Sequence, residues 1–309
     1  MAPTSYDLAV IGHFSIDTIV LPTRKSPFIV LGGPVTYTSF TAKNLGACAC
    51  AISKVGASFP QAYLWWLEQE GINITNVIRR PDEATTGFEL TYSHDFEVRT
   101  LKLKNKGTEL KTEDIPTDFH AKAIHLGPIT NEITYEVAEQ IKKSGDILSL
   151  DPQGLTRSFD KEGNVLENAA SFDSRIFSLI DVYKSSKNEI HTLTGESELK
   201  HAIKAIHDIG VKTVIVTMSD RGAILSVEGT QYNIGVYPPN VRVDPTGAGD
   251  AFIGAFLTEY LQGKEPLWCA TVGSAAASLV IEGIGPTYFG KKEEIYQRAN
   301  ILYEKELKQ

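Results

Sequence analysis

The sequence has few of the residues that build covalent or metal-bound scaffolds. Its 309 residues include only three cysteines, Cys48, Cys50 and Cys269, an odd number without the spacing of a zinc site. Cys48 and Cys50 stand two apart in a strand-like run, so we interpret them as small core side chains. This usage predicts a protein of a reducing compartment and not a secreted fold held together by disulfides.

An excess of positive charge and a membrane-length apolar run are also missing. The net charge of −8 argues against nucleic acid or an anionic membrane as the main partner. The longest apolar run of the C-terminal half, residues 268–281, is too short to cross a bilayer and contains glycine and several serines. Residues 1–6 are short and polar, unlike a signal peptide. We therefore expect a cytoplasmic protein that binds neither nucleic acid nor membrane.

Two common phosphate-binding motifs are absent from the sequence. No Gly-x-x-x-x-Gly-Lys-Ser/Thr string occurs, and Phe252 stands where a dinucleotide fingerprint would need its third glycine. The sequence does contain the string Asp-Pro-Thr-Gly-Ala-Gly-Asp-Ala-Phe at residues 244–252. It follows a strand-like run at residues 231–243 and opens an apolar helix that we expect to reach about residue 262.

This string predicts an anion site with a base beside it. Gly247, Ala248 and Gly249 leave backbone N–H groups unhindered where a helix begins, at the positive end of its dipole. The carboxylate of Asp250 would repel a phosphate already bound there. Its presence makes sense if it accepts the proton of a hydroxyl that attacks a phosphoryl group. The alternative interpretation is a helix start with no role beyond capping.

The pattern along the chain predicts an α/β protein. With 42% hydrophobic and 22% charged residues, the composition is ordinary for a soluble protein with a sizeable core. Strand-like and helix-like segments alternate, except at residues 86–93 and 96–104, which form an amphipathic hairpin with a turn at His94 and Asp95. We predict a doubly wound, mostly parallel sheet flanked by helices, with a small second β-sheet that includes this hairpin.

Polar residues follow several of the predicted strands, at the sheet edge where α/β proteins bind ligands. Asp17 follows the strand at residues 6–12 and could accept hydrogen bonds from two neighbouring hydroxyls, although capping a turn is the alternative role. Gly32 and Gly33 would allow close approach of a ligand to the backbone, or would simply begin a helix at Pro34.

Residues 244–252 resemble the C-terminal signature of the ribokinase-like (PfkB) family of sugar kinases, and the resemblance extends over essentially the whole chain. It implies one ribokinase-like α/β domain over residues 1–309. It also implies a discontinuous β lid, from about residues 14–36 and 86–104, that covers the substrate. In this resemblance Asp250 is the catalytic base, and the amides of Gly247, Ala248 and Gly249 stabilise charge on the transferred group.

The resemblance also implies substrate-binding residues. The Gly32-Gly33 stretch of the family contacts substrate and usually continues with a polar residue and an asparagine, where this chain has Pro34 and Tyr37. The string Asp-Pro-Gln-Gly-Leu-Thr-Arg at residues 151–157 is similar to one in an inositol-kinase-like branch, or is a turn with a surface arginine. The implied substrate-binding set is Asp17, Gly32, Gly33, Gln153, Arg157 and Asp250.

Nucleotide and metal sites follow in the same way. In the family an Asn-x-x-Glu organises magnesium-bound phosphates through water; here Ser186 replaces the asparagine and Glu189 matches the glutamate. A glycine loop at residues 282–287, near Asp244, implies a monovalent cation site for which K+ is the candidate. The implied nucleotide-binding set is Ser186, Thr217, Ser219, Gly222, Thr246, Gly247 and Gly249, with Ser219 in place of a family glycine.

These features together predict phosphoryl transfer from MgATP to a hydroxyl of a small polyol, either a sugar or an inositol-like molecule. A nucleoside kinase on the same scaffold is an alternative, with Phe14, Tyr37 and Phe88 available for a base pocket. A non-catalytic sensor of sugars or nucleotides is another, although such a protein would have no need of a base at Asp250. An apolar outer face of the lid would permit a homodimer.

Overall fold

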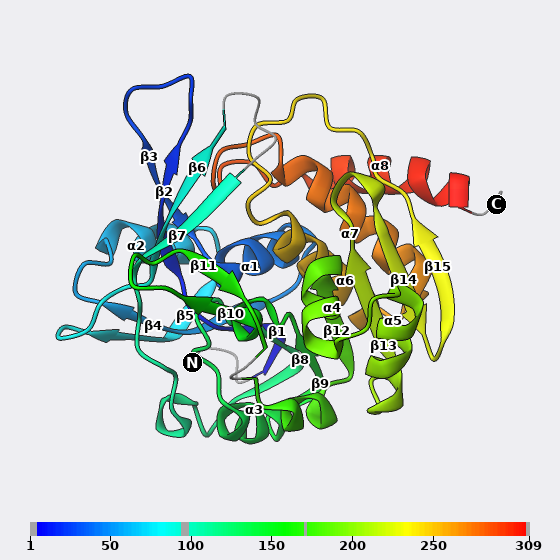
Figure 1. Cartoon of the computed structure of the whole chain (residues 1–309), viewed down its shortest axis with the longest axis horizontal. Helices are drawn as coiled ribbons and strands as arrows, with labels where there is room; N and C mark the ends of the chain where they lie inside the picture. Colours follow the sequence, from blue (N-terminus) through cyan, green and yellow to red (C-terminus); the bar gives the residue numbers. More distant parts are fainter. Residues whose placement is uncertain (1–4, 94–98, 170–171, 307–309) are drawn as a thin grey trace.

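The computed structural model describes residues 5–93, 99–169 and 172–306, so the predicted turn at His94 and Asp95 lies outside the described residues. Its main feature is a nine-stranded sheet (Figure 1). All neighbouring strands are parallel except for the two pairs that include β14. In spatial order the strands are β15 (Thr230–Ile234), β14 (Ala223–Val227), β13 (Thr213–Thr217), β12 (Val182–Ser186), β9 (Gly145–Leu150), β8 (His120–Leu126), β1 (Ser5–Ile11), β4 (Ala49–Gly56) and β5 (Asn73–Arg80).

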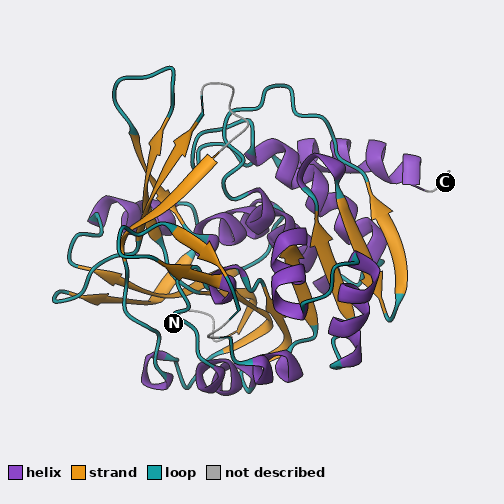
Figure 2. Ribbon diagram, viewed as in Figure 1, coloured by secondary structure: helices purple, strands orange, loops and turns teal. Residues whose placement is uncertain are grey.

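Helices cover both faces of this sheet (Figure 2). Successive residues of β1 enter opposite cores, with Ala9 and Ile11 on one side and Leu8 and Val10 on the other. One core includes α3 (Tyr135–Lys142), α4 (Lys187–Thr194) and α5 (Leu199–Asp208); the other includes α1 (Pro34–Asn44), α2 (Gln61–Gln69), α6 (Ala248–Leu261) and α7 (Pro266–Val280). The helix α8 (Lys292–Glu306) packs against α7. The predicted doubly wound α/β fold is confirmed.

The order of the strands reverses beside β1. From β1 the chain proceeds to β4 and β5 on one side, and then to β8, β9, β12 and β13 on the other. Neighbouring connections therefore diverge between β1 and β8, and sheets of this kind are expected to have their ligand-binding crevice there, at the carboxyl ends of the strands. The segments that follow β1, β8, β9 and β12 all begin at this edge.

A second sheet of four strands stands apart from the first, at the upper left of Figure 1. Its order is β3 (Phe28–Gly32), β2 (Ser15–Val20), β6 (Gly87–Tyr92) and β7 (Arg99–Asn105), and it contains the predicted hairpin. Ile19 and Tyr92 pack in one cluster of its buried face, and Phe88 and Leu90 pack in another.

The opposite face of the four-stranded sheet is mixed in character. Thr18 and Glu89 pair across its central strands, Glu89 forms an ion pair with Lys104 at 3.2 Å, and the side chain of Ile29 is 67% exposed. The homodimer expected through an apolar outer face stays a prediction. No helix in the described ranges is long and apolar enough to cross a membrane.

Two local predictions differ from the structure, and one element was not predicted. The strand-like run at residues 231–243 is a strand only as far as Ile234, because the next residue, Gly235, donates its N–H to Oε1 of Glu306 and accepts from the hydroxyl of Ser274. Cys48 is exposed, so its interpretation as a core side chain is wrong, whereas Cys50 and Cys269 are buried. A two-stranded sheet of β10 (Arg157–Phe159) and β11 (Val165–Glu167) was not predicted.

Candidate active site

The site is built around the first turn of α6, which lies over the crevice edge of the sheet. Gly247 caps the helix with φ of 80°, and Asp250 is the third helical residue. A Cβ on Gly247 would overlap the ring of Tyr37, so both backbone angle and space require glycine there. The N–H of Ala248 donates to the carbonyl of Pro245 at 3.2 Å. The Ala248 amide is therefore engaged within the turn, whereas the other amides of a first helical turn have no acceptor within the helix and are suited to an anion.

A buried lysine lies directly against this turn. Lys184, in β12, forms an ion pair with Asp151 at 2.5 Å, and the two side chains are 6% and 1% exposed. The register explains the contact, because Tyr183 pairs with Leu150, one position earlier on each strand. The Nζ of Lys184 lies 2.5 Å from where a Cβ on Gly249 would be. The structure thus adds a cation to the predicted anion site.

The charges of this cluster act on Asp250. Burial raises the pKa of Asp250 to about 7, with Lys184 opposing the shift and the Asp151 carboxylate adding to it. Burial also disfavours the charge on Lys184, but the carboxylates of Asp151, Asp250 and Glu189 outweigh it and raise the pKa of the ammonium. A carboxyl that titrates near neutral pH can accept a proton efficiently. The arrangement is that of a base beside a permanently charged lysine.

Asp17 lies on β2 of the small sheet and is buried. Its Oδ1 accepts a hydrogen bond from the N–H of Phe88 at 3.3 Å. A Cβ on Gly32 would overlap the Asp17 carboxylate, and one on Gly33, with φ of 88°, would overlap the carbonyl of His13. Both glycines are therefore required by the packing of the protein itself, and their contact with a substrate stays a prediction.

Two further polar groups lie in this region; Ser15 was not predicted, and Tyr37 was expected only as part of a base pocket. Within the described ranges, the hydroxyls of Ser15 and Tyr37 are buried without a hydrogen-bond partner. Burial raises the pKa of Tyr37, and the charges of Asp244, Asp17 and Asp250 raise it further. A buried polar group without a partner is costly unless a ligand satisfies it.

Gln153 and Arg157 lie together near the cluster. The Nη2 of Arg157 donates to Oε1 of Gln153 at 2.6 Å, and Gln153 N–H donates to Oδ1 of Asp151 at 3.3 Å. The positive charge of Arg157 also opposes the raised pKa of Asp250. The structure therefore brings the 151–157 segment to Asp250, as its place after β9 predicts.

The predicted nucleotide and metal residues lie at the ends of β12 and β13. Ser186 and Glu189 form a capping box at the start of α4: Ser186 N–H donates to Oε2 of Glu189 at 2.7 Å, and Glu189 N–H donates to Oγ of Ser186 at 3.3 Å. Thr217 donates to the carbonyl of Ser185 at 3.2 Å. The turn that follows has positive φ at Ser219 (56°) and Gly222 (82°), so the serine adopts a conformation that usually favours glycine.

Asp244 receives hydrogen bonds on both carboxylate oxygens. Its Oδ1 accepts from the hydroxyl of Tyr92 at 2.6 Å and from the N–H of Thr246 at 3.0 Å. Its Oδ2 accepts from the N–H of Gly285 at 3.3 Å. The monovalent cation expected at Asp244 stays a prediction, and the contact with Tyr92 was not anticipated.

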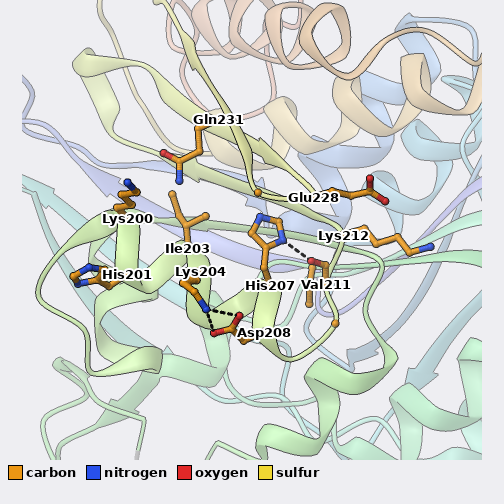
Figure 3. A pocket seen from close by; sticks show the side chains of 12 residues that line it. Lys200, His201, Ile203, Lys204, His207, Asp208, Val211, Lys212, Glu228 and Gln231 are labelled. Atoms are coloured by element: carbon orange, nitrogen blue, oxygen red, sulfur yellow. Dashed lines mark hydrogen bonds and ion pairs between the residues drawn. The ribbon is translucent and has the colours of Figure 1, made fainter.

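A pocket of about 630 Å³ lies elsewhere, between α5 and the β14–β15 hairpin (Figure 3). Lysine and histidine side chains line it, including Lys204 and His207, together with Asp208. None of its 12 lining residues belongs to the predicted site. The predicted site residues and this pocket are therefore separate.

Comparison with known proteins gives an independent result. The family model described as pfkB family carbohydrate kinase matches residues 7–292. The chain is 27% identical over 282 residues to a cytidine kinase of Thermococcus kodakarensis. The alignment covers 90% of this chain and 97% of that protein.

Two solved structures share the fold. One is a pyrophosphate-dependent kinase in the ribokinase family complexed with a pyrophosphate analog and myo-inositol, with a TM-score of 0.79 and 21% identity over 94% of this chain and 99% of that one. The other is the nucleoside kinase of Methanocaldococcus jannaschii, with a TM-score of 0.78 and 21% identity over 97% and 99% of the two chains.

Proposed function

Because this chain belongs to the pfkB family of carbohydrate kinases, and so is a phosphotransferase, we propose that it transfers the γ-phosphoryl group of MgATP to a hydroxyl of a small polyol. The observation that carries the proposal is the carboxyl of Asp250, buried with a pKa raised to about 7 at the start of α6. The family membership defines the class of reaction, and the proposal concerns the donor, the acceptor and the roles of the residues.

In the proposed reaction the acceptor oxygen forms a bond to the γ-phosphorus as the bond to the bridging oxygen of ADP breaks. Asp250 accepts the proton of the acceptor hydroxyl. Charge on the transferred group is stabilised by the amides of Gly247, Ala248 and Gly249 and by the ammonium of Lys184, which lies against Gly249. Preorganised donors of this kind contribute about 3–4 kcal/mol each to transition-state stabilisation in enzymes where they have been removed.

Glu189 is proposed to support magnesium through water. Mg²⁺ usually keeps several waters and binds to one or two carboxylates and the substrate phosphates. The half-buried Glu189, held at the start of α4 and close enough to influence Lys184 and Asp250, fits that mode of binding. The bound ion would neutralise negative charge on the phosphates. The nucleotide itself is proposed to contact Ser186, Thr217, Ser219, Gly222 and Thr246.

The acceptor is proposed to lie under the four-stranded sheet, which would act as a lid. Asp17 would accept hydrogen bonds from acceptor hydroxyls, with Gly32, Gly33, Gln153 and Arg157 beside it. Closure of such a lid would exclude water and suppress hydrolysis of ATP. The burial of Asp17 at 5% exposure supports this location.

A nucleoside is the second candidate acceptor. The similarity to a cytidine kinase favours it. Of the aromatic side chains expected to form a base pocket, Phe14 packs against Phe59 with ring centroids 5.8 Å apart, whereas Phe88 lies in the buried face of the small sheet with Leu90 and Ile129. Phe88 is therefore the better placed to contact a base.

Product release across a panel of sugars, inositols and nucleosides tests the proposal. ADP would be measured with MgATP as donor, and orthophosphate release with pyrophosphate as donor in a parallel series. Turnover of one polyol with ATP supports the proposal, and turnover restricted to nucleosides keeps the mechanism but changes the acceptor. Binding of ligands without turnover on any acceptor would contradict it in favour of a sensor.

Asp17→Asn provides a test of the acceptor site. The variant keeps the shape of the side chain but loses the charge that strengthens hydrogen bonds to hydroxyls. We expect the KM for the acceptor to rise about tenfold or more while the KM for ATP changes little. Steady-state kinetics with each substrate varied in turn would measure this. An equal rise in both KM values would contradict a specific role at the acceptor.

A further inference from the structure

The two ends of strand β6 contact two parts of the proposed active site, Asp17 at the acceptor and Asp244 in the signature. At its beginning the N–H of Phe88 donates to Oδ1 of Asp17 at 3.3 Å, and at its end the hydroxyl of Tyr92 donates to Oδ1 of Asp244 at 2.6 Å. Both residues lie on the buried face of the strand, about 13 Å apart along it. One strand of the small sheet thus connects the proposed acceptor carboxylate to the first residue of the signature.

Asp244 links Tyr92 to the turn that contains Gly247. The same Oδ1 that accepts from Tyr92 also accepts from the N–H of Thr246, and Oδ2 accepts from the N–H of Gly285. Thr246 immediately precedes Gly247, whose positive φ begins α6. Asp244 is 1% exposed, so loss of one donor would leave a buried charge less well satisfied and displace the turn.

The effect of the Tyr92 hydroxyl can be tested without changing the packing of the ring. The ring is buried in a cluster with Ile19 and Leu21, on the same sheet. Phenylalanine at this position would keep these contacts and remove the donor to Asp244. The bond itself joins segments 152 residues apart, between the small sheet and the start of α6.

We propose that Tyr92 is a positioning residue that couples acceptor placement beneath the small sheet to the geometry of the signature turn. The inference rests on the proposed function. An acceptor held at Asp17 keeps β6 in place, Tyr92 then holds Asp244, and Asp244 holds the turn in which Gly247 and Asp250 are aligned. Without an acceptor the small sheet moves more and Tyr92 holds Asp244 for less of the time, so ATP bound alone is poorly hydrolysed.

The test compares Tyr92→Phe with Tyr296→Phe. Tyr296, on α8, also donates to a carboxylate, Oε1 of Glu259 at 2.7 Å, and so provides a matched control outside the site. We expect Tyr92→Phe to lower kcat about tenfold or more, to leave the acceptor KM within about threefold, and to raise acceptor-independent ADP release relative to transfer. Tyr296→Phe should leave all three quantities near the wild-type values.

Hydrogen exchange of residues 244–250 gives a second readout that does not depend on turnover. We expect these amides to exchange faster in Tyr92→Phe than in wild type or Tyr296→Phe, and the acceptor to slow exchange only where Tyr92 is intact. Exchange and kinetics that are the same in both variants would overturn the inference. If wild type shows no turnover, the proposed function is contradicted. The exchange rates of the amides in residues 244–250, measured without acceptor, would still show whether Tyr92 holds the turn.

Discussion

Asp250→Asn is expected to lower kcat by about a hundredfold or more, because the amide cannot accept the proton of the acceptor hydroxyl. The substitution keeps the shape of the side chain at the start of α6, so binding of ATP should persist. Steady-state ADP release and a separate measurement of nucleotide affinity would distinguish the two effects. Asp208→Asn is a suitable control, since Asp208 is paired with Lys204 on the remote face of the molecule.

The pH dependence of wild type tests the same assignment. A base must be deprotonated to act, so kcat/KM should fall as the pH is lowered through about 7, the raised pKa of Asp250. The pH profile of the residual activity of Asp250→Asn should lack this fall at low pH, the acid limb of the profile. A wild-type profile that stays flat down to pH 5 would contradict the role of Asp250 as the base.

The same pKa shift has a consequence for stability. A carboxyl with a folded-state pKa of about 7, against an ordinary value of 3.8, binds more protons in the folded than in the unfolded state between these values. Its favourable contribution is present at low pH and is lost as the pH rises from about 4 to 7. Asp250→Asn should therefore unfold at a higher temperature than wild type at pH 8, and the difference should narrow as the pH falls toward 4.

The parts of the site that were predicted from the sequence are those fixed by local structure. The signature at residues 244–252 specifies its own turn and helix start, so the cap at Gly247 and the place of Asp250 in the first helical turn could be predicted without knowledge of the fold. The 151–157 segment was placed near Asp250 because it follows the parallel strand β9. Asp17, predicted on the same argument, lies instead within β2 of the small sheet, six residues beyond the end of β1.

The residues that were missed depend on contacts between distant segments. Lys184 meets Asp151 only through the pairing of β12 with β9, and Tyr92 meets Asp244 only because the small sheet lies over the signature. A lysine near the end of an apolar strand was the available signal for the first, since a buried lysine needs a partner. No local pattern marks the second. Ser186 and Glu189 show a different limit, because Ser-x-x-Glu is also the pattern of the capping box that they form.

Lys184→Met is expected to lower kcat by a factor of about 10² to 10³, since it removes a fixed charge from the position where phosphoryl charge develops. It should also move the acid limb of the pH profile. The charge of Lys184 opposes the raised pKa of Asp250, so without it the limb should shift to higher pH. The substitution also leaves the buried carboxylate of Asp151 without its partner, which should cost about 3–5 kcal/mol of folding free energy.

The double variant Lys184→Met with Asp151→Asn separates catalysis from stability. Removal of both charges takes away the unpaired carboxylate, so most of the lost stability should return, as measured by thermal or denaturant unfolding. Turnover should stay low, because the cation against Gly249 is still missing. Recovery of wild-type turnover in the double variant would mean that Lys184 serves only to pair with Asp151. Low turnover in a stable double variant would instead mean that the buried ammonium of Lys184 acts on the transferred phosphoryl group.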